Sequence, residues 1–408
     1  ELENTVPDKL KDFAVSTSEL INGDEFKTVS KARSSTREFA SSNKLDQVDL
    51  IHLCSNLGTA ESKALAKALE NSVKYNRTSS DMTNANGISI YFPYQKTSKV
   101  SSAVAAYEAI GLDSEYSKCI QQFASMEVGG QAMSGGSASP LSALLSGVTD
   151  SQSSGSGMDI LSGLLSGNLF DVSGLTSGNS SFFGRGLDLE QAAIYLDNNQ
   201  LDLSRLTWQN VNGTPGIQLT DEEWSLINDL ELNVFYDDGE GYIDLGLDNR
   251  FAISASGTLS GVFDGTWLSI DRQPIAYYHL DTVESGSSYT ITGRVPVLLN
   301  GERADLLLVF TDAQPYGTIA GATYEYTEST TETVAKSLTE LTEGDVIDFI
   351  CDYYDYDGSF LDSYMLGDQW IYHADPEIGN VDINGDRVLA TYRFTDIYNQ
   401  QYWTPEMP

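Results

Sequence analysis

Basic residues are scarce in this chain of 408 residues. It has 23 Lys and Arg against 59 Asp and Glu, which gives a formal net charge of -36 at pH 7. A surface this negative repels phosphate groups, so we expect neither nucleic acid nor an anionic membrane as a partner. The sequence also has no apolar run near the roughly 20 residues that a transmembrane helix needs, so no membrane span is expected.

Cysteine is scarce as well. Cys54, Cys119 and Cys351 are far apart, odd in number and in no Cys-x-x-Cys arrangement. The cysteines therefore indicate neither a disulfide framework nor a zinc site. The sequence starts at Glu1 without an initiator Met or a signal-peptide pattern, and we expect that processing or truncation has removed the true beginning.

The acidic residues are unevenly distributed. Residues 1–128 hold 14 basic and 17 acidic side chains, whereas residues 129–408 hold 9 basic and 42 acidic ones. Such different surfaces predict separate domains. We interpret the acidic part as the solubilising surface of an exported bacterial protein, with calcium sites or steering of a basic substrate as alternatives.

Residues 1–128 are predicted to be helical with one strand. Apolar residues recur at helical spacing along several segments. Asp46 is expected to open one helix, in which Val48, Ile51 and Cys54 share a face. The range 88–92 predicts a short buried strand that Pro93 ends. The segments predicted as helices lie at 10–20, 26–32, 46–57, 61–73, 103–110 and 116–123.

Residues 129–185 are dominated by Ser, Gly and Leu. The heptapeptide LSALLSG at Leu141 is nearly repeated as LSGLLSG at Leu161. This composition is typical of a flexible connector, so the range is predicted to be a linker.

Residues 186–408 are predicted to form an acidic, β-rich accessory domain. A capping box from Thr220 to Glu223 predicts a helix with Trp224, Ile227 and Leu230 on its buried side. Segments of alternating apolar and polar residues follow, separated by turn signals. The clearest turn signals are Asp264-Gly265, Asn300-Gly301 and Asn384-Gly385. The pattern predicts an all-β sandwich or barrel with one or two helices.

Nucleophilic catalysis needs a Cys or Ser within hydrogen-bond reach of a base. His52 and Cys54 are two positions apart on a predicted helix, so their side chains point to different sides and we interpret Cys54 as a core thiol. Cys351 lies on the packing face of a predicted strand. His279 or His373 could approach Cys351 across a sheet, but no local motif indicates it.

Two acidic segments resemble part of a calcium-binding loop. One is DINGD, with Asp382, Asn384 and Asp386, and the other is DDGEG at Asp237. Alternating oxygen donors with a glycine suit calcium. However, Asn-Gly between strands favours a hairpin, and the closing Glu of a full calcium loop is absent. We predict turns here and in the Asp-rich segment 352–370, with calcium kept as the possible cofactor.

Aromatic residues (Tyr 22, Phe 15 and Trp 5) gather in the β-rich part. We expect most of them to pack on sheet surfaces. A sugar- or peptide-binding face is the alternative.

Several motifs together resemble a known family. KARSSTREFASSNKLDQVDLIHL followed by GISIYFPY is similar to the later part of the clostripain-like cysteine peptidases. The motifs ELNVFYDDGEGYIDLGLDN, FDGTWLSIDRQPIAYY, DSYMLGDQW and YRFTDIYNQQYWTP resemble the C-terminal extension of clostripain-related proteins from gut bacteria. The similarity touches nearly all of the chain except the linker. It implies an α+β multidomain protein: the helical and late-strand part of a caspase-like α/β core, then the β-rich domain.

The sequence departs from the family pattern at the catalytic motifs. Family members carry a catalytic His in His-Gly and a catalytic Cys in Asp-Ala-Cys, and this chain has neither motif. By order, both would precede Glu1, as would the acidic residue that selects Arg or Lys. We therefore assign no catalytic, cofactor-binding or metal residue within the chain, and we expect the strand at 88–92 to join a sheet built upstream.

The resemblance implies the C-terminal part of a secreted or surface-attached endopeptidase that cleaves after Arg or Lys. Its expected partners are protein or peptide substrates and the upstream part of its own polypeptide. Two alternatives stay open. One is a non-catalytic cell-surface binding or adhesion protein on the same scaffold, which an exposed aromatic strip would favour. The other is an acidic module stabilised by calcium.

Overall fold

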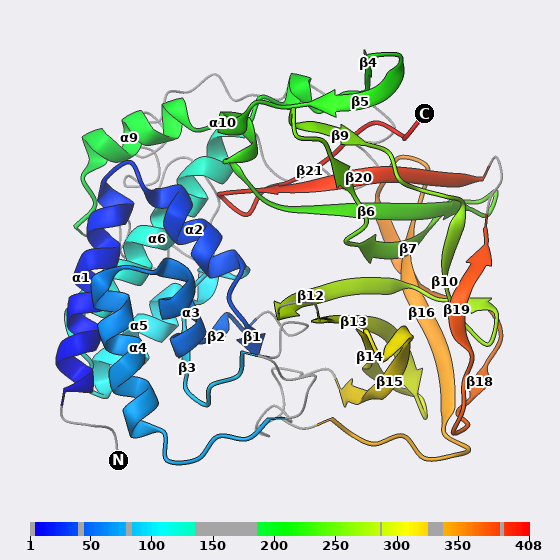
Figure 1. Cartoon of the computed structure of the whole chain (residues 1–408), viewed down its shortest axis with the longest axis horizontal. Coiled ribbons are helices and arrows are strands. Elements are labelled where there is room, and N and C mark those ends of the chain that lie inside the picture. Colours follow the sequence, from blue (N-terminus) through cyan, green and yellow to red (C-terminus); the bar gives the residue numbers. More distant parts are fainter. Residues whose placement is uncertain are drawn as a thin grey trace.

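The computed structural model shows helices gathered on one side of the molecule and strands on the other (Figure 1). It describes residues 5–39, 45–78, 84–134, 186–285, 288–324, 338–383 and 387–408. The chain is therefore a mixed α+β, multidomain protein. Within the described residues, no helix is long and apolar enough to cross a membrane.

The helical side contains seven α-helices among the described residues, and a small sheet lies within it. The helices are α1 (Val6–Asn22), α2 (Phe26–Ser34), α3 (Leu50–Leu57), α4 (Ala60–Ser72), α5 (Val100–Ala109), α6 (Ser114–Met133) and α9 (Leu189–Asn198). The apolar stripes predicted from the sequence pack into one core. Phe13, Phe26, Leu65 and Phe123 are fully buried in it.

The small sheet contains the short strand predicted at 88–92 and its pairing partner. Its order is β1 (Glu38–Phe39), β2 (Gln47–Asp49), β3 (Ser89–Tyr91), with antiparallel pairing throughout. On the other side of β3, the Tyr91 N–H donates to the Tyr107 hydroxyl, and the Tyr91 carbonyl accepts from the Tyr116 hydroxyl. β3 thus pairs with β2 of this chain at one edge, and at the other edge Tyr91 has hydrogen-bond partners within the chain. A further strand from upstream of Glu1 stays a prediction.

Asp46 does not open a helix as predicted. Residues 47–49 form β2, and Asp49 caps α3 by accepting the N–H of His52. Ile51 and Cys54 lie in α3 as predicted, whereas Val48 precedes it, because pairing with β3 makes residues 47–49 a strand.

The predicted linker begins within helix α6, and one helix beyond its predicted end packs in the helical core. Helix α6 continues to Met133, so residues 129–133 are helical. Helix α9, assigned above to the β-rich domain, buries Ala192, Tyr195 and Leu196 in the helical core. Residues 135–185, including the Leu-containing repeats, lie outside the described residues.

The β side is built on an 11-stranded sheet. Its main path is β15-β14-β13-β12-β7-β6-β20-β21, with β16, β17 and β18 off this path. Both β12 and β16 pair with β7 and with β13, each at a different end of those two strands. The strands of this sheet are β6 (Ile227–Asp237), β7 (Tyr242–Asp248), β12 (Tyr277–Ser285), β13 (Ser288–Leu299), β14 (Glu302–Thr311), β15 (Gln314–Tyr324), β16 (Val346–Tyr354), β17 (Phe360–Met365), β18 (Trp370–Ile371), β20 (Val388–Asp396) and β21 (Gln401–Trp403).

Two smaller sheets and two short helices complete the described β side. One sheet has the order β11-β10-β19 and the other β4-β5-β9-β8. Their bounds, with those of the helices, are β4 (Gln209–Val211), β5 (Thr214–Gln218), β8 (Ala252–Ile253), β9 (Thr258–Ser260), β10 (Thr266–Ile270), β11 (Gln273–Pro274), β19 (Ile378–Asp382), η3 (Leu203–Arg205) and α10 (Asp221–Trp224). The predicted capping box is present at Thr220. However, α10 has only four residues, and Ile227 already starts β6, so the longer helix predicted there is wrong.

The two sides share a core. The turn between β20 and β21 places Ile397 and Tyr398, both fully buried, among the residues of the helical core. The Tyr398 ring stacks on Phe26 with centroids 5.6 Å apart. We call residues 397–400 the docking turn. Its backbone carbonyls accept hydrogen bonds from Ser30 and Gln131, at 2.6 and 2.7 Å.

Candidate functional site

The three cysteines are buried thiols. Cys54 and Cys119 are fully buried in the helical core, and Cys351 is 3% exposed in the core of the β side. Burial raises the pKa of the Cys54 and Cys119 thiols to about 12, and that of Cys351 still further. A nucleophilic thiol needs the opposite shift, because only the thiolate attacks. The interpretation of Cys54 as a core thiol is confirmed.

The three histidines have partners other than these thiols. His52 Nδ1 accepts the backbone N–H of Arg37, His279 bonds the Thr282 hydroxyl, and His373 bonds the Asp271 carboxylate at 2.7 Å. The Cys351 thiol bonds the Tyr364 carbonyl at 3.6 Å. Among the described residues, the structure therefore records no hydrogen bond between a cysteine and a histidine.

The acidic loops in the described residues are turns. At DDGEG, the Asp237 carboxylate accepts the N–H of Gly239, and Asp238 accepts those of Glu240 and Gly241. These bonds close the β6–β7 hairpin, as predicted. Within the described residues, no group of three or more His, Cys, Asp or Glu is arranged to hold a metal ion. In DINGD, Asp382 ends β19, whereas Asn384 and Asp386 lie outside the described residues.

The turn within 352–370 has the same construction. It joins β16 to β17, and the Asp355 carboxylate accepts the backbone N–H groups of Asp357 and Ser359. Here too the predicted turn is confirmed.

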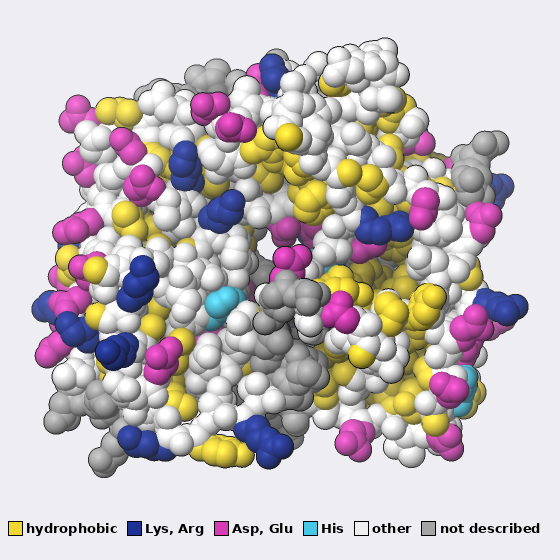
Figure 2. Space-filling model, in the orientation of Figure 1, with side chains coloured by type: hydrophobic (Ala, Val, Ile, Leu, Met, Phe, Trp, Pro, Cys, Tyr) yellow, Lys and Arg dark blue, Asp and Glu magenta, His cyan; other side chains and the backbone are white. Residues whose placement is uncertain are grey.

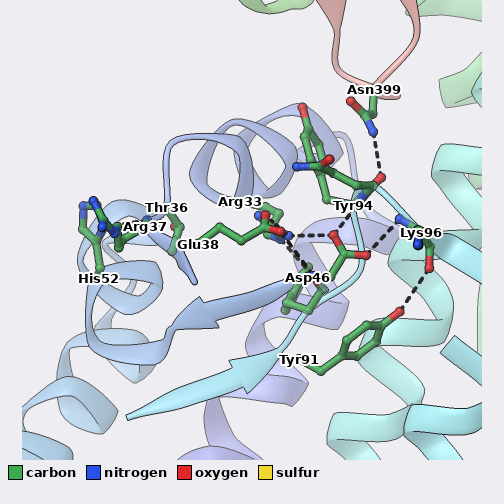
Figure 3. A network of polar contacts seen from close by, with 12 residues as sticks. Arg33, Thr36, Arg37, Glu38, Asp46, His52, Tyr91, Tyr94, Lys96 and Asn399 are labelled. Carbon is green, nitrogen blue, oxygen red and sulfur yellow. Dashed lines mark hydrogen bonds and ion pairs between the residues drawn. The ribbon is translucent and has the colours of Figure 1, made fainter. Parts of the chain in front are cut away.

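A buried polar site lies inside the helical side, around Arg33 of α2 (Figure 3). The Arg33 guanidinium is 2% exposed and pairs with Glu38 at 3.0 Å and Asp46 at 3.1 Å. It also donates to the Phe92 carbonyl at 2.9 Å, and it lies over the Tyr94 ring. These contacts join α2 to the segments that carry Glu38, Asp46 and Phe92.

Asp46 is the second centre of this site. Its backbone φ of 55° lies in the left-handed region, which Asp adopts more readily than most residues. Its buried carboxylate accepts the backbone N–H groups of Gln95 and Lys96 at 2.8 and 3.0 Å, besides the contact with Arg33. One charged pair thus fixes the segment that follows β3 onto α2 (Figure 3).

The site continues to the β side through Tyr94. Its carbonyl accepts the side-chain amide of Asn399 in the docking turn at 2.7 Å. Its hydroxyl accepts a hydrogen bond at 3.3 Å from the side-chain amide of Asn228, the second residue of β6. The network around Arg33 therefore also positions the surface on which the β side packs.

Glu127 is the exceptional residue near this network. It is fully buried in α6, and neither carboxylate oxygen has a hydrogen-bond partner in the structure. Burial raises its pKa well above the ordinary value. Asp46 raises it further, Arg33 lowers it, and Asp396 raises it. Burial therefore favours the neutral acid form of Glu127, because an ionised carboxylate without a partner is very costly to bury.

A further buried carboxyl, Asp396, lies where the sides meet. Burial raises the pKa of Asp396 to about 7. Asp396 accepts the N–H groups of Tyr398 and Gln400, and so it shapes the docking turn.

The sequence reasoning missed Arg33 and Glu127, although a signal was present. Glu127 follows Phe123 by four residues and so continues the stripe of Ile120 and Phe123. Arg33 follows Val29 in the same way on α2. A charged residue on the buried face of a helix predicts a buried polar site.

Part of the aromatic surface is exposed. Tyr356, Phe360 and Tyr364 are 46%, 56% and 37% exposed around the β16–β17 hairpin. The hydroxyls of Tyr356 and Tyr353 donate to Asp237 and Asp238 of the β6–β7 turn. Acidic side chains also appear over both sides of the molecule on the face shown in Figure 2, whereas basic ones lie mostly over the helices.

Comparison of the chain with models of known protein families, with curated proteins and with solved structures finds no match.

Proposed function

We propose that this chain is the C-terminal portion of a secreted, clostripain-like cysteine endopeptidase that cleaves after Arg or Lys. In this proposal the helical side with β1 to β3 is the late part of a caspase-like core. The β side is an accessory domain of sandwich or barrel type that presents substrate or attaches the enzyme to the cell surface. The catalytic His and Cys belong to residues upstream of Glu1.

The observation that carries the proposal is the state of the three thiols. Each is buried, and burial raises the pKa of each. A peptidase that contains this chain needs a thiolate and a base from elsewhere in its polypeptide. In the complete enzyme, the thiolate would attack the carbonyl that follows Arg or Lys, with a His as general base and then acid.

The shared core supports an accessory domain that is firmly attached. The docking turn inserts Tyr398 among helices α2 and α6, and the network from Arg33 to Asn399 connects both sides. An accessory domain packed in this way holds its surfaces at a fixed position relative to the helical side.

The proposal is tested with the purified chain and an arginine ester such as benzoyl-arginine ethyl ester. We expect no hydrolysis above background. Hydrolysis that is lost in Cys351→Ser or Cys54→Ser, with the fold intact, would refute the assignment of catalysis to upstream residues. Cys119→Ser is the matched control for loss of a buried thiol.

One observation favours the second candidate, a non-catalytic surface-binding protein. The β16–β17 hairpin exposes the aromatic side chains of Tyr356, Phe360 and Tyr364. Retention of the chain on a glycan array, lost in Phe360→Ala, would support this candidate. An upstream reading frame with the peptidase motifs would speak against it.

A further inference from the structure

Strand β17 exposes apolar side chains on both of its faces. Phe360, Leu361 and Met365 are 56%, 52% and 60% exposed, and Tyr364 is 37% exposed. Consecutive positions of a strand point to opposite faces. β17 therefore covers little of the core, and most of its apolar surface contacts water. Adjacent exposed apolar residues of this kind mark interaction surfaces.

The backbone of β17 has an open edge. Within the described residues, β17 pairs with β16 alone. The Leu366 N–H bonds the Phe349 carbonyl, and antiparallel pairing alternates. Tyr364 and Asp362 therefore direct their backbone groups toward β16, whereas Ser363 and Met365 direct theirs away from it.

Asp362 partly covers this edge. Its carboxylate accepts the N–H of Ser363 at 2.7 Å, which is a local bond between neighbouring residues on an exposed strand. An incoming strand that offers a carbonyl to Ser363 would release the Asp362 carboxylate for a cationic side chain. Exposed edges pair with extended peptides by this exchange of backbone hydrogen bonds.

The charges around β17 define the occupant. Asp352 lies opposite Ser363 in register on β16, and Asp355 and Asp357 lie in the connecting turn. On the basic side, Arg303 bonds the Ser363 hydroxyl. A second copy of the chain would bring its own Asp362 and a net charge of -36 against this edge, which disfavours self-pairing.

We propose that β17 is a docking edge for an extended peptide in which basic and apolar residues alternate. The peptide adds as a strand beyond β17. Its backbone bonds Ser363 and Met365, its apolar side chains cover Leu361 and Met365, and its basic side chains meet Asp362 and the acidic turn. This binding does not depend on the proposed peptidase chemistry.

The probe is fluorescein-labelled acetyl-KVKVKVK-amide, followed by fluorescence anisotropy with the whole chain. We expect saturable binding that weakens as salt rises, because the basic side chains contribute through charge. An EVEVEVE peptide is expected not to bind. A KVKPKVK peptide, which lacks a backbone N–H at its centre, is expected to bind more weakly.

Two variants locate the site. Met365→Lys places a positive charge on an exposed position of β17 and should weaken binding about tenfold or more. Asp362→Asn tests the charge alone and should weaken it less. The matched control is Tyr316→Lys on β15, which is at another edge of the sheet and whose side chain is 75% exposed. Circular dichroism checks that each variant is folded.

The proposal is overturned by any of three results. These are no binding at peptide concentrations up to about 1 mM, binding that Met365→Lys and Asp362→Asn leave unchanged, or binding that only Tyr316→Lys removes. Dimerisation of the chain that Met365→Lys abolishes would assign the edge to a second copy and overturn it too.

Discussion

Replacing Glu127 by Met is expected to stabilise the protein, and increasingly so as the pH rises. Glu127 is fully buried without a hydrogen-bond partner, and burial raises its pKa well above the ordinary 4.5. At pH values between the pKa of Glu127 in the unfolded state and its pKa in the folded state, only the folded state keeps the proton on this carboxyl. Stability from this group is thus complete below the unfolded pKa and falls as the pH rises toward the folded pKa.

The size of the effect has two parts. Each pH unit within this window removes about 1.4 kcal/mol from the free energy of unfolding of the wild type. In addition, a buried polar group without partners costs about 1–3 kcal/mol even when it is neutral. Met has a similar length and neither cost, so Glu127→Met should exceed the wild type in stability by a margin that grows by about 1.4 kcal/mol per pH unit.

The assay is urea unfolding followed by circular dichroism of the helices at pH values from 5 to 8. Glu70→Met, at an exposed position of α4, is the control and should change stability by less than about 0.5 kcal/mol at every pH. A Glu127→Met protein that is less stable than the wild type across this range, or a difference that shrinks with rising pH, would refute the reasoning.

Three further predictions concern the core. Gly130→Ala would place a Cβ 2.1 Å from the Tyr398 ring, so it should destabilise the protein by about 1–3 kcal/mol in urea unfolding. Gly379→Ala is the control and should not destabilise it, because no atom lies within 4 Å of the added Cβ. Arg33→Met leaves two buried carboxylates without their cation and should cost about 3–5 kcal/mol in the same assay, against less than about 1 kcal/mol for Lys9→Met, whose ion pair is exposed. Finally, Ellman's reagent should label none of the three cysteines in the native protein and all three in denaturant. Labelling of a native thiol at neutral pH would contradict its burial.

The sequence predicted those local features that depend on residues close together in the chain. The turn at Asp237 and the capping box at Thr220 follow from side chains that bond backbone groups two or three residues away. The burial of Cys54 follows from its position on an apolar stripe. These features could be predicted because each depends on residues that are close together in the sequence.

Features that depend on distant segments could not be read in the same way. Residues 47–49 are a strand because β3, some 40 residues later, pairs with them. The docking turn is buried because helices α2 and α6 provide its pocket, more than 260 residues earlier in the chain. Nothing in the local spacing around Tyr398 distinguishes a buried turn from an exposed hairpin.

The buried polar site is an intermediate case. Arg33 and Glu127 each continue an apolar stripe, which marks them as buried. Their relation depends on the fold, because Arg33 has two carboxylate partners whereas Glu127 has none. A pattern can therefore locate such residues, but it cannot assign their partners.

The most direct test of the central claim is to sequence the coding DNA upstream of Glu1. The proposed function predicts a His-Gly motif and, after it, an Asp-Ala-Cys motif in the same open reading frame. A reading frame that carries an export signal and neither motif would contradict the peptidase proposal and leave the surface-binding protein as the better account.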